Sequence, residues 1–126
     1  PIYPASRMDA EGGSMDEFAD GFLLTKATME YFAEHYAAKD DDILVSPYLG
    51  NLSNSPPTVL VTAGLDPLRD QGREYAAELI RHGVNTTYIE MSGNVHGFIN
   101  IRKAVPSARQ DVDTMIAAWK TLLSSL

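Results

Sequence analysis

The second half of the chain constrains the fold most, because two strand patterns alternate there with two helix patterns. Residues 58–63 are a β-branched apolar run, typical of a strand covered on both faces. Residues 67–82 have helical spacing and end at Gly83. A second strand pattern covers 86–91, and a last helix pattern covers 107–126. This alternation predicts an α/β fold with parallel strands joined by right-handed crossovers.

The last helix pattern carries an apolar stripe that we expect to face the core. Its members are Val112, Met115, Ile116, Trp119, Leu122, Leu123 and Leu126. The first half of the chain is more polar. Residues 5–20 contain paired glycines and an acidic cluster, which predicts a solvated loop. Thr25 can cap a helix running to about Ala37, and the opening Pro1–Pro4 has the pattern of a strand ending.

Composition excludes several function classes. The formal net charge of −7 and the lack of a basic patch argue against a nucleic-acid partner. No apolar run reaches the roughly 18 residues of a membrane span. The absence of cysteine removes disulfides and thiolate metal sites, and the three histidines lack metal-ligand spacing, so we expect no metal. Cysteine-free composition is compatible with a reducing compartment, and we expect a cytoplasmic location.

Two side chains lie just beyond the carboxyl ends of predicted strands, where binding and reactive groups are found in open parallel sheets. Asp66 follows the first strand pattern and His96 follows the second. Parallel strands end at the same sheet edge, so the two side chains can meet. A carboxylate beside an imidazole sets its tautomer and stabilises the imidazolium of a general base.

Each of these residues also has a simpler interpretation. Asp66 precedes a proline and is equally suited to cap the following helix, and a loop histidine such as His96 is often a surface residue. His35 and His82 lie on predicted helices and are weaker candidates. Asp70, inside a helix, and Glu90, within or at the end of a strand, are weaker acids.

Several motifs resemble the hormone-sensitive-lipase family of esterases, which are α/β-hydrolases. The matching segments are Ser46-Pro47, Leu52-Ser53 with Pro56-Pro57, Val59 to Ala63, Asp66-Pro67-Leu68-Arg69-Asp70 and His96-Gly97-Phe98. The opening Ile2-Tyr3-Pro4 and the segment 21–36 also resemble that family's passage from its sixth strand into its cap. The resemblance covers nearly the whole chain.

The resemblance implies that residues 1–126 are the C-terminal part of one α/β-hydrolase domain, with flanking helices and part of a cap. Residues 9–45 would be a loop and a cap-linked helix, and 56–126 the strand-helix-strand-helix unit. Asp66 would be the triad acid and His96 the base. Phe22, Leu23, Phe98 and Ile99 are candidate walls of an apolar substrate pocket, although core packing is a competing explanation for each.

The family's nucleophile elbow, Gly-x-Ser-x-Gly, and its His-Gly-Gly-Gly stretch at the oxyanion hole do not occur here. Both lie upstream in the family. We therefore expect a fragment whose serine lies in a separate N-terminal half, inactive alone, and partnered by that half or by a second copy in a homodimer.

The function implied is carboxylic-ester hydrolysis of small ester substrates by a Ser-His-Asp triad without a cofactor. The alternative is a non-catalytic ligand-binding or interaction protein on the same scaffold. Gibberellin receptors, which resemble this family but lack its catalytic histidine, are examples. The presence of His96 favours the esterase.

Overall fold

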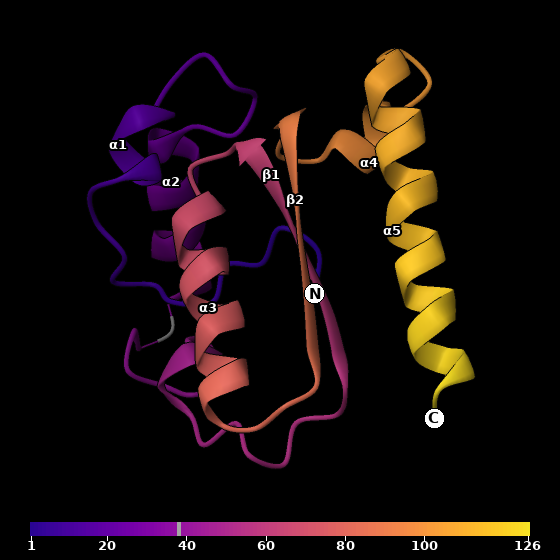
Figure 1. The fold of residues 1–126 in the computed structure, drawn as a ribbon. Coiled ribbons are helices and arrows are strands. Elements are labelled where there is room, and N and C mark those ends of the chain that lie inside the picture. Colours follow the sequence, from indigo (N-terminus) through magenta and orange to yellow (C-terminus); the bar gives the residue numbers. More distant parts are fainter. Residues whose placement is uncertain (38) are drawn as a thin grey trace.

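The computed structural model describes residues 1–37 and 39–126, so one residue of the expected 9–45 segment, residue 38, lies outside the described residues. The elements alternate along the chain after a helical first part (Figure 1). In order, they are α1 Ser14–Glu17, α2 Lys26–Tyr36, a 3₁₀ turn Pro47–Leu49, β1 Thr58–Leu65, α3 Arg69–Arg81, β2 Thr86–Val95, α4 Phe98–Ile101 and α5 Pro106–Ser124.

The two strands pair in parallel, as the strand-helix-strand pattern predicts. The opening residues extend this sheet, because Ile2 forms a parallel bridge with Val61. The backbone N–H of Tyr3 donates to the Val61 carbonyl at 2.6 Å, and the Val61 N–H donates to the Pro1 carbonyl at 3.0 Å. β1 therefore lies between β2 and the opening residues. Such a central strand must be apolar on both faces, and six of its eight residues are buried.

Helices cover both faces of this sheet, with α3 on one side and α5 on the other (Figure 1). Successive side chains of β1 point to opposite faces of the sheet. Leu60 packs with Ala76 and Leu79 of α3 in one cluster, whereas Val61 packs with Ala108 and Val112 of α5 in the other. The expected α/β architecture is confirmed.

β2 runs longer than its sequence pattern predicts, through Val95 rather than ending at residue 91. The sheet register shifts there: Ala63 pairs with Met91, but Leu65 pairs with Val95. The polar, glycine-containing stretch 92–94 forms a bulge in β2 rather than a loop. A bulge bends its strand and re-aims the side chains beyond it, and His96 is the first residue after β2.

The expectation of a solvated loop over residues 5–20 is wrong for part of that segment. Ser6, Ser14, Met15 and Phe18 are buried. Polar residues can be buried where their hydrogen bonds are satisfied. Ser6 meets this condition, because its N–H donates to Gln71 Oε1 at 2.8 Å and its hydroxyl donates to the Gln71 carbonyl at 3.0 Å.

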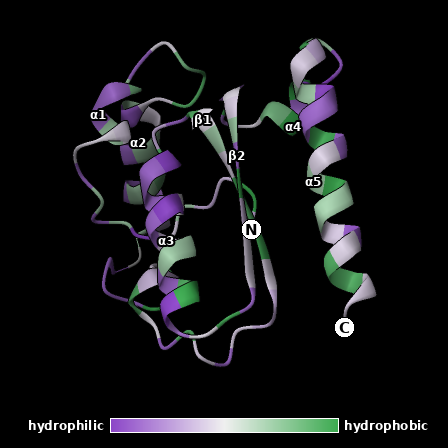
Figure 2. Ribbon diagram, viewed as in Figure 1, coloured by the Kyte–Doolittle hydropathy of each residue, from purple (hydrophilic) through white to green (hydrophobic). Residues whose placement is uncertain are grey.

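The apolar stripe of α5 is only partly covered. Val112 is buried, but Trp119 is 55% exposed and Leu123 is 49% exposed. Apolar residues recur along the length of the helix in Figure 2. The first half of α5 therefore belongs to the core of the described chain, and its second half presents an uncovered apolar face.

Candidate active site

Asp66 and His96 meet at the carboxyl ends of β1 and β2. His96 Nδ1 lies 2.8 Å from Asp66 Oδ2, although thirty positions separate the two residues. Asp66 is fully buried, whereas the His96 side chain is 26% exposed. The contact expected from parallel strand topology is present.

The second carboxylate oxygen of Asp66 is also occupied. The backbone N–H of Leu68 donates to Asp66 Oδ1 at 2.9 Å, closing a turn before α3. Pro67 and Leu68 belong to this turn, so α3 begins at Arg69 rather than at Pro67 as expected. Asp66 thus both caps a turn and binds the imidazole, and the two interpretations of this residue are compatible.

This geometry sets the imidazole tautomer. An ionised carboxylate only accepts hydrogen bonds, so Nδ1 carries the proton and a neutral ring has its lone pair on Nε2. Within residues 1–37 and 39–126, no group hydrogen-bonds to His96 Nε2. An imidazole held in this way can take a proton at Nε2 while the carboxylate stabilises the resulting cation.

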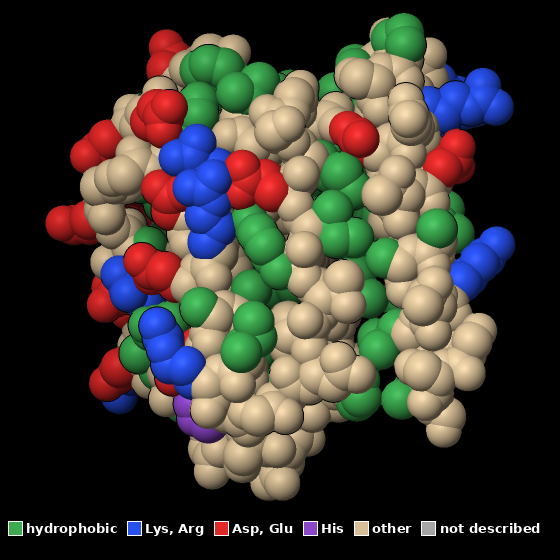
Figure 3. All heavy atoms as spheres, viewed as in Figure 1, with side chains coloured by type: hydrophobic (Ala, Val, Ile, Leu, Met, Phe, Trp, Pro, Cys, Tyr) green, Lys and Arg blue, Asp and Glu red, His purple; other side chains and the backbone are tan. Residues whose placement is uncertain are grey.

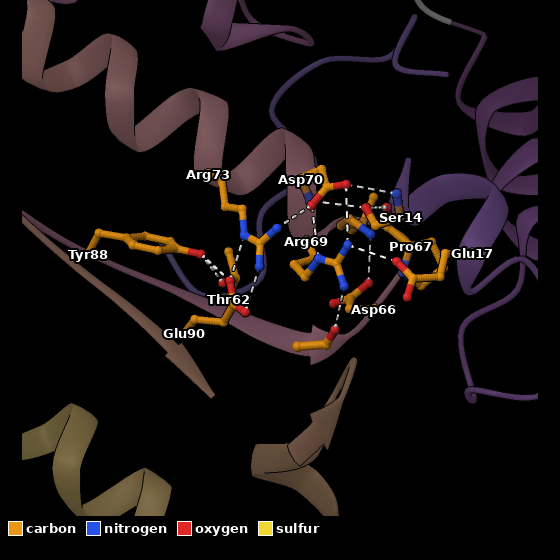
Figure 4. Close-up of polar contacts among 12 residues, drawn as sticks. Ser14, Glu17, Thr62, Asp66, Pro67, Arg69, Asp70, Arg73, Tyr88 and Glu90 are labelled. Atoms are coloured by element: carbon orange, nitrogen blue, oxygen red, sulfur yellow. Dashed lines mark hydrogen bonds and ion pairs between the residues drawn. The ribbon is translucent and has the colours of Figure 1, made fainter. Parts of the chain in front are cut away.

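Ser14 fastens the turn of Asp66 to the segment that holds α1 (Figure 4). Its hydroxyl donates to the Pro67 carbonyl at 2.8 Å and accepts from the Asp70 N–H at 3.0 Å. Its own N–H donates to Asp70 Oδ2 at 2.9 Å. The hydrogen bond from Arg69 lowers the pKa of Asp70 despite partial burial. Asp70 is therefore a structural anchor and makes no contact with His96 among the described groups.

Glu90 is likewise engaged elsewhere, on the α3 side of β2 (Figure 4). Both carboxylate oxygens accept from Arg73, at 2.7 and 2.8 Å. Tyr88 adds a hydrogen bond at 2.8 Å. The bonded guanidinium of Arg73 lowers the pKa of Glu90. The two-pronged pairing with Arg73 occupies both oxygens of the Glu90 carboxylate. Among the described residues, this carboxylate makes no hydrogen bond to the imidazole of His96.

The other two histidines bind backbone carbonyls of their own helices. His35 Nδ1 lies 2.8 Å from the Tyr31 carbonyl, and His82 Nδ1 lies 3.0 Å from the Glu78 carbonyl. Of the three imidazoles, only that of His96 is paired with a buried carboxylate at the strand ends in the part of the chain that is described.

An apolar pocket of about 430 Å³ opens beside His96. Helix α2 and the segment that precedes it supply most of its walls. The lining comprises Ile2, Tyr3, Ala5, Met8, Leu24, Met29, Phe32, Ala33, Tyr36, Leu68 and His96. This apolar lining can hold an apolar group against the imidazole. Partial burial, with the nearby Asp66 charge, raises the pKa of Tyr3.

The four pocket residues proposed from sequence lie differently. Phe98 is fully buried and Ile99 packs against the same core cluster. Phe22 packs edge-to-face on Phe18, with ring centroids 4.9 Å apart. Leu23 is 66% exposed and approaches Gly97, next to His96. None of the four lines this pocket in the described chain. The helical spacing of Met29, Phe32, Ala33 and Tyr36 on α2 was the available sequence signal for its wall.

Among the described residues, no group of three or more His, Asp or Glu side chains is placed to hold a metal ion. No helix within them is long and apolar enough to cross a membrane.

A parallel sheet with helices on both faces, and polar side chains that meet beyond the carboxyl ends of its strands, is the architecture of the open α/β class of proteins. Comparison with protein families matches residues 1–100 to the family described as the alpha/beta hydrolase fold. The chain belongs to this α/β-hydrolase family, in agreement with its resemblance to hormone-sensitive-lipase-type esterases.

Individual relatives are esterases by name. The chain is 35% identical to an arylesterase of Saccharolobus solfataricus and 33% identical to the carboxylic ester hydrolase LipN of Mycobacterium tuberculosis. Among solved structures, an ester hydrolase from the Lake Arreo metagenome, complexed with a bipyridine phosphonate derivative, is 36% identical with a TM-score of 0.84.

These matches span nearly all of this chain but a minor share of each relative. They cover 94% of the chain and 39% of the arylesterase, 98% and 34% for LipN, and 93% and 39% for the Lake Arreo structure.

Proposed function

We propose that this chain supplies the acid and the base of a serine carboxylic-ester hydrolase. The supporting observation is the 2.8 Å contact between His96 Nδ1 and the buried Asp66 carboxylate, beside an apolar pocket. The nucleophilic serine and the oxyanion donors would come from sequence outside residues 1–126, because the Gly-x-Ser-x-Gly and His-Gly-Gly-Gly motifs do not occur within them.

The reaction would proceed in two halves. His96 Nε2 takes the proton of the serine hydroxyl as the serine oxygen attacks the ester carbonyl, and it then gives that proton to the departing alcohol. In the second half, His96 takes a proton from water as the water oxygen attacks the acyl carbonyl, and it gives that proton to the serine oxygen, so that the carboxylic acid leaves and the serine hydroxyl is restored. Asp66 keeps the proton on Nδ1 and stabilises the imidazolium in both halves.

The pocket suggests where an apolar part of the ester would rest. Its walls are mostly aliphatic and aromatic side chains, and His96 is among the lining residues. An acyl or alcohol chain placed there would bring its carbonyl to the imidazole edge without displacing the Asp66 contact.

Steady-state hydrolysis of p-nitrophenyl acetate and butyrate tests the proposal. The complete protein should turn both substrates over, and residues 1–126 alone should not exceed a histidine-containing control peptide. Saturable turnover by residues 1–126 that depends on one of their own serines would contradict the division of the triad. A complete protein that binds ester analogues without turnover would favour the ligand-binding alternative.

A further inference from the structure

Tyr3 lies directly against the imidazole of His96. The two ring centroids are 4.4 Å apart, with an interplanar angle of 56°. The same tyrosine ring contacts Phe98 edge-to-face, with centroids 5.8 Å apart and an angle of 72°. Phe98 is fully buried in the core cluster between the sheet and α5. The tyrosine ring thus joins the packed core to the partly exposed imidazole.

The backbone of Tyr3 has an unusual conformation. Its φ angle is 38°, in the left-handed region that side-chain-bearing residues seldom adopt. Pro4 follows, and a proline further restricts the residue before it. Such a conformation persists only where its surroundings hold it, and it is concentrated at functional sites.

Two contacts of Tyr3 hold this conformation. Its N–H donates to the Val61 carbonyl at 2.6 Å, which ties it to the central strand. Its ring is fixed by Phe98 on the core side. With its backbone in this conformation, Tyr3 packs its ring against both Phe98 and His96.

We propose that Tyr3 is a positioning residue that confines the His96 ring to the orientation in which Nδ1 meets Asp66 and Nε2 faces the reacting atoms. This inference rests on the proposed function for its catalytic consequence. The Asp66 contact alone constrains one ring nitrogen, and the imidazole can still rotate away from it by breaking that contact. The Tyr3 ring, which packs against the imidazole at a tilt of 56°, opposes this rotation.

Kinetics of the complete protein separate positioning from substrate binding. Tyr3→Leu should lower kcat about tenfold, since small misplacements of a catalytic group are costly. Tyr3 also lines the pocket, which keeps its other walls in the variant, so KM should change less than kcat, whereas a tyrosine that mainly bound substrate would raise KM and leave kcat unchanged. Tyr3→Phe keeps the ring and should retain most of kcat. Tyr75→Leu, which removes a partly buried tyrosine ring on the α3 side, is the matched control and should leave both constants near wild type.

Three kinetic outcomes would overturn the proposal. They are a rise in KM with unchanged kcat in Tyr3→Leu, a loss in Tyr3→Phe as large as in Tyr3→Leu, and no loss in either variant.

NMR of the wild-type complete protein tests the contact without turnover and without any variant that must fold. Nuclear Overhauser effects between the Tyr3 ring and the His96 imidazole are expected, with the Nδ1-protonated tautomer. Tyr3→Phe should preserve both signatures. Their absence from a folded, active wild type would refute the positioning of His96 by Tyr3 and leave the esterase proposal standing. An inactive wild type that shows both signatures would refute the esterase proposal and, with it, a catalytic role for Tyr3.

Discussion

At the scale of single residues, the site depends on which carboxylate faces the imidazole. Asp66 has both oxygens committed, one to the Leu68 N–H and one to His96, whereas Glu90 is paired with Arg73. The sequence alone favours Asp66 over Asp70 and Glu90, but it does not show which groups the two weaker candidates contact. Only the fold shows that Glu90 points to the α3 side of the sheet and that Asp70 anchors Ser14.

This arrangement predicts a steep ranking of acid variants in the complete protein. Asp66→Asn should lower kcat by about 10⁴-fold, as the same tautomer-spoiling change does in the serine-protease triad, and His96→Ala should remove nearly all turnover. Glu90→Gln should cost far less, because it disturbs contacts with Arg73 and Tyr88 and none with His96 among the described residues. Hydrolysis of p-nitrophenyl butyrate measures the activity of all three variants. A loss of nearly all turnover in Glu90→Gln would show that the assignment of Asp66 as the acid is wrong.

Ser14 offers a second residue-scale test, because its buried hydroxyl bridges the Pro67 carbonyl and the Asp70 N–H. Ser14→Ala leaves both groups without this partner and should lower the free energy of unfolding by about 1–3 kcal/mol. Ser124→Ala, at an exposed hydroxyl of α5, should change it by less than about 0.5 kcal/mol. Urea denaturation of the complete protein gives both values. Equal changes in the two variants would mean that the hydrogen bonds of the Ser14 hydroxyl do not stabilise the fold.

At the scale of elements, the order and type of strands and helices could be predicted because apolar spacing reports burial directly. The exact ends of β2 and α3 could not. Residues 92–94 have turn-like composition, yet they form a bulge because Gly64 lets the two backbones approach. α3 starts late because the Asp66 side chain closes the preceding turn.

The residues that line the pocket could not be predicted from the sequence, for a physical reason. Phe98 and Ile99 follow His96 in sequence, but the short helix α4 turns them into the core. The pocket is instead lined by α2, whose apolar side chains show helical spacing but whose placement beside His96 depends on long-range packing.

Gly64 provides the element-scale prediction. A Cβ at this position would lie 2.4 Å from the Ser92 backbone, whereas a Cβ at Gly93 meets nothing within 4 Å. Backbone cannot yield as a side chain can, so Gly64→Ala should lower the free energy of unfolding by about 1–3 kcal/mol or more. Gly93→Ala, in the facing strand, is the control and should have a small effect. Urea denaturation distinguishes them, and similar stability of the two variants would contradict the close strand approach.

At the scale of the whole molecule, the described chain exposes surfaces that resemble interfaces. Hydrophobic atoms are visible between the sheet and α5 in Figure 3, whereas charged side chains gather over α1 and α3. A groove of about 500 Å³ there is lined by Pro1, Ile2, Pro56, Pro57, Thr58, Val59, Val61, Met115, Ile116, Trp119 and Leu122. An unpaired strand edge beside an apolar groove favours association.

Residues 1–126 produced alone should therefore associate. Light scattering is expected to show oligomers or aggregates, and adding the remainder of the complete protein should give a compact complex with esterase activity. A cooperative monomer at micromolar concentration, with slowly exchanging amides along Thr58–Leu65, would show that the exposed groove needs no partner.

Covalent labelling with an organophosphonate tests the central claim most directly, because such reagents react with a serine that a histidine has activated. In the complete protein, mass spectrometry should locate the label on one serine outside residues 1–126. His96→Ala should slow labelling by orders of magnitude, and Tyr75→Leu should not. A label on a serine within residues 1–126, or an unchanged labelling rate in His96→Ala, would contradict the assignment of Asp66 and His96 as the acid and base of a divided triad.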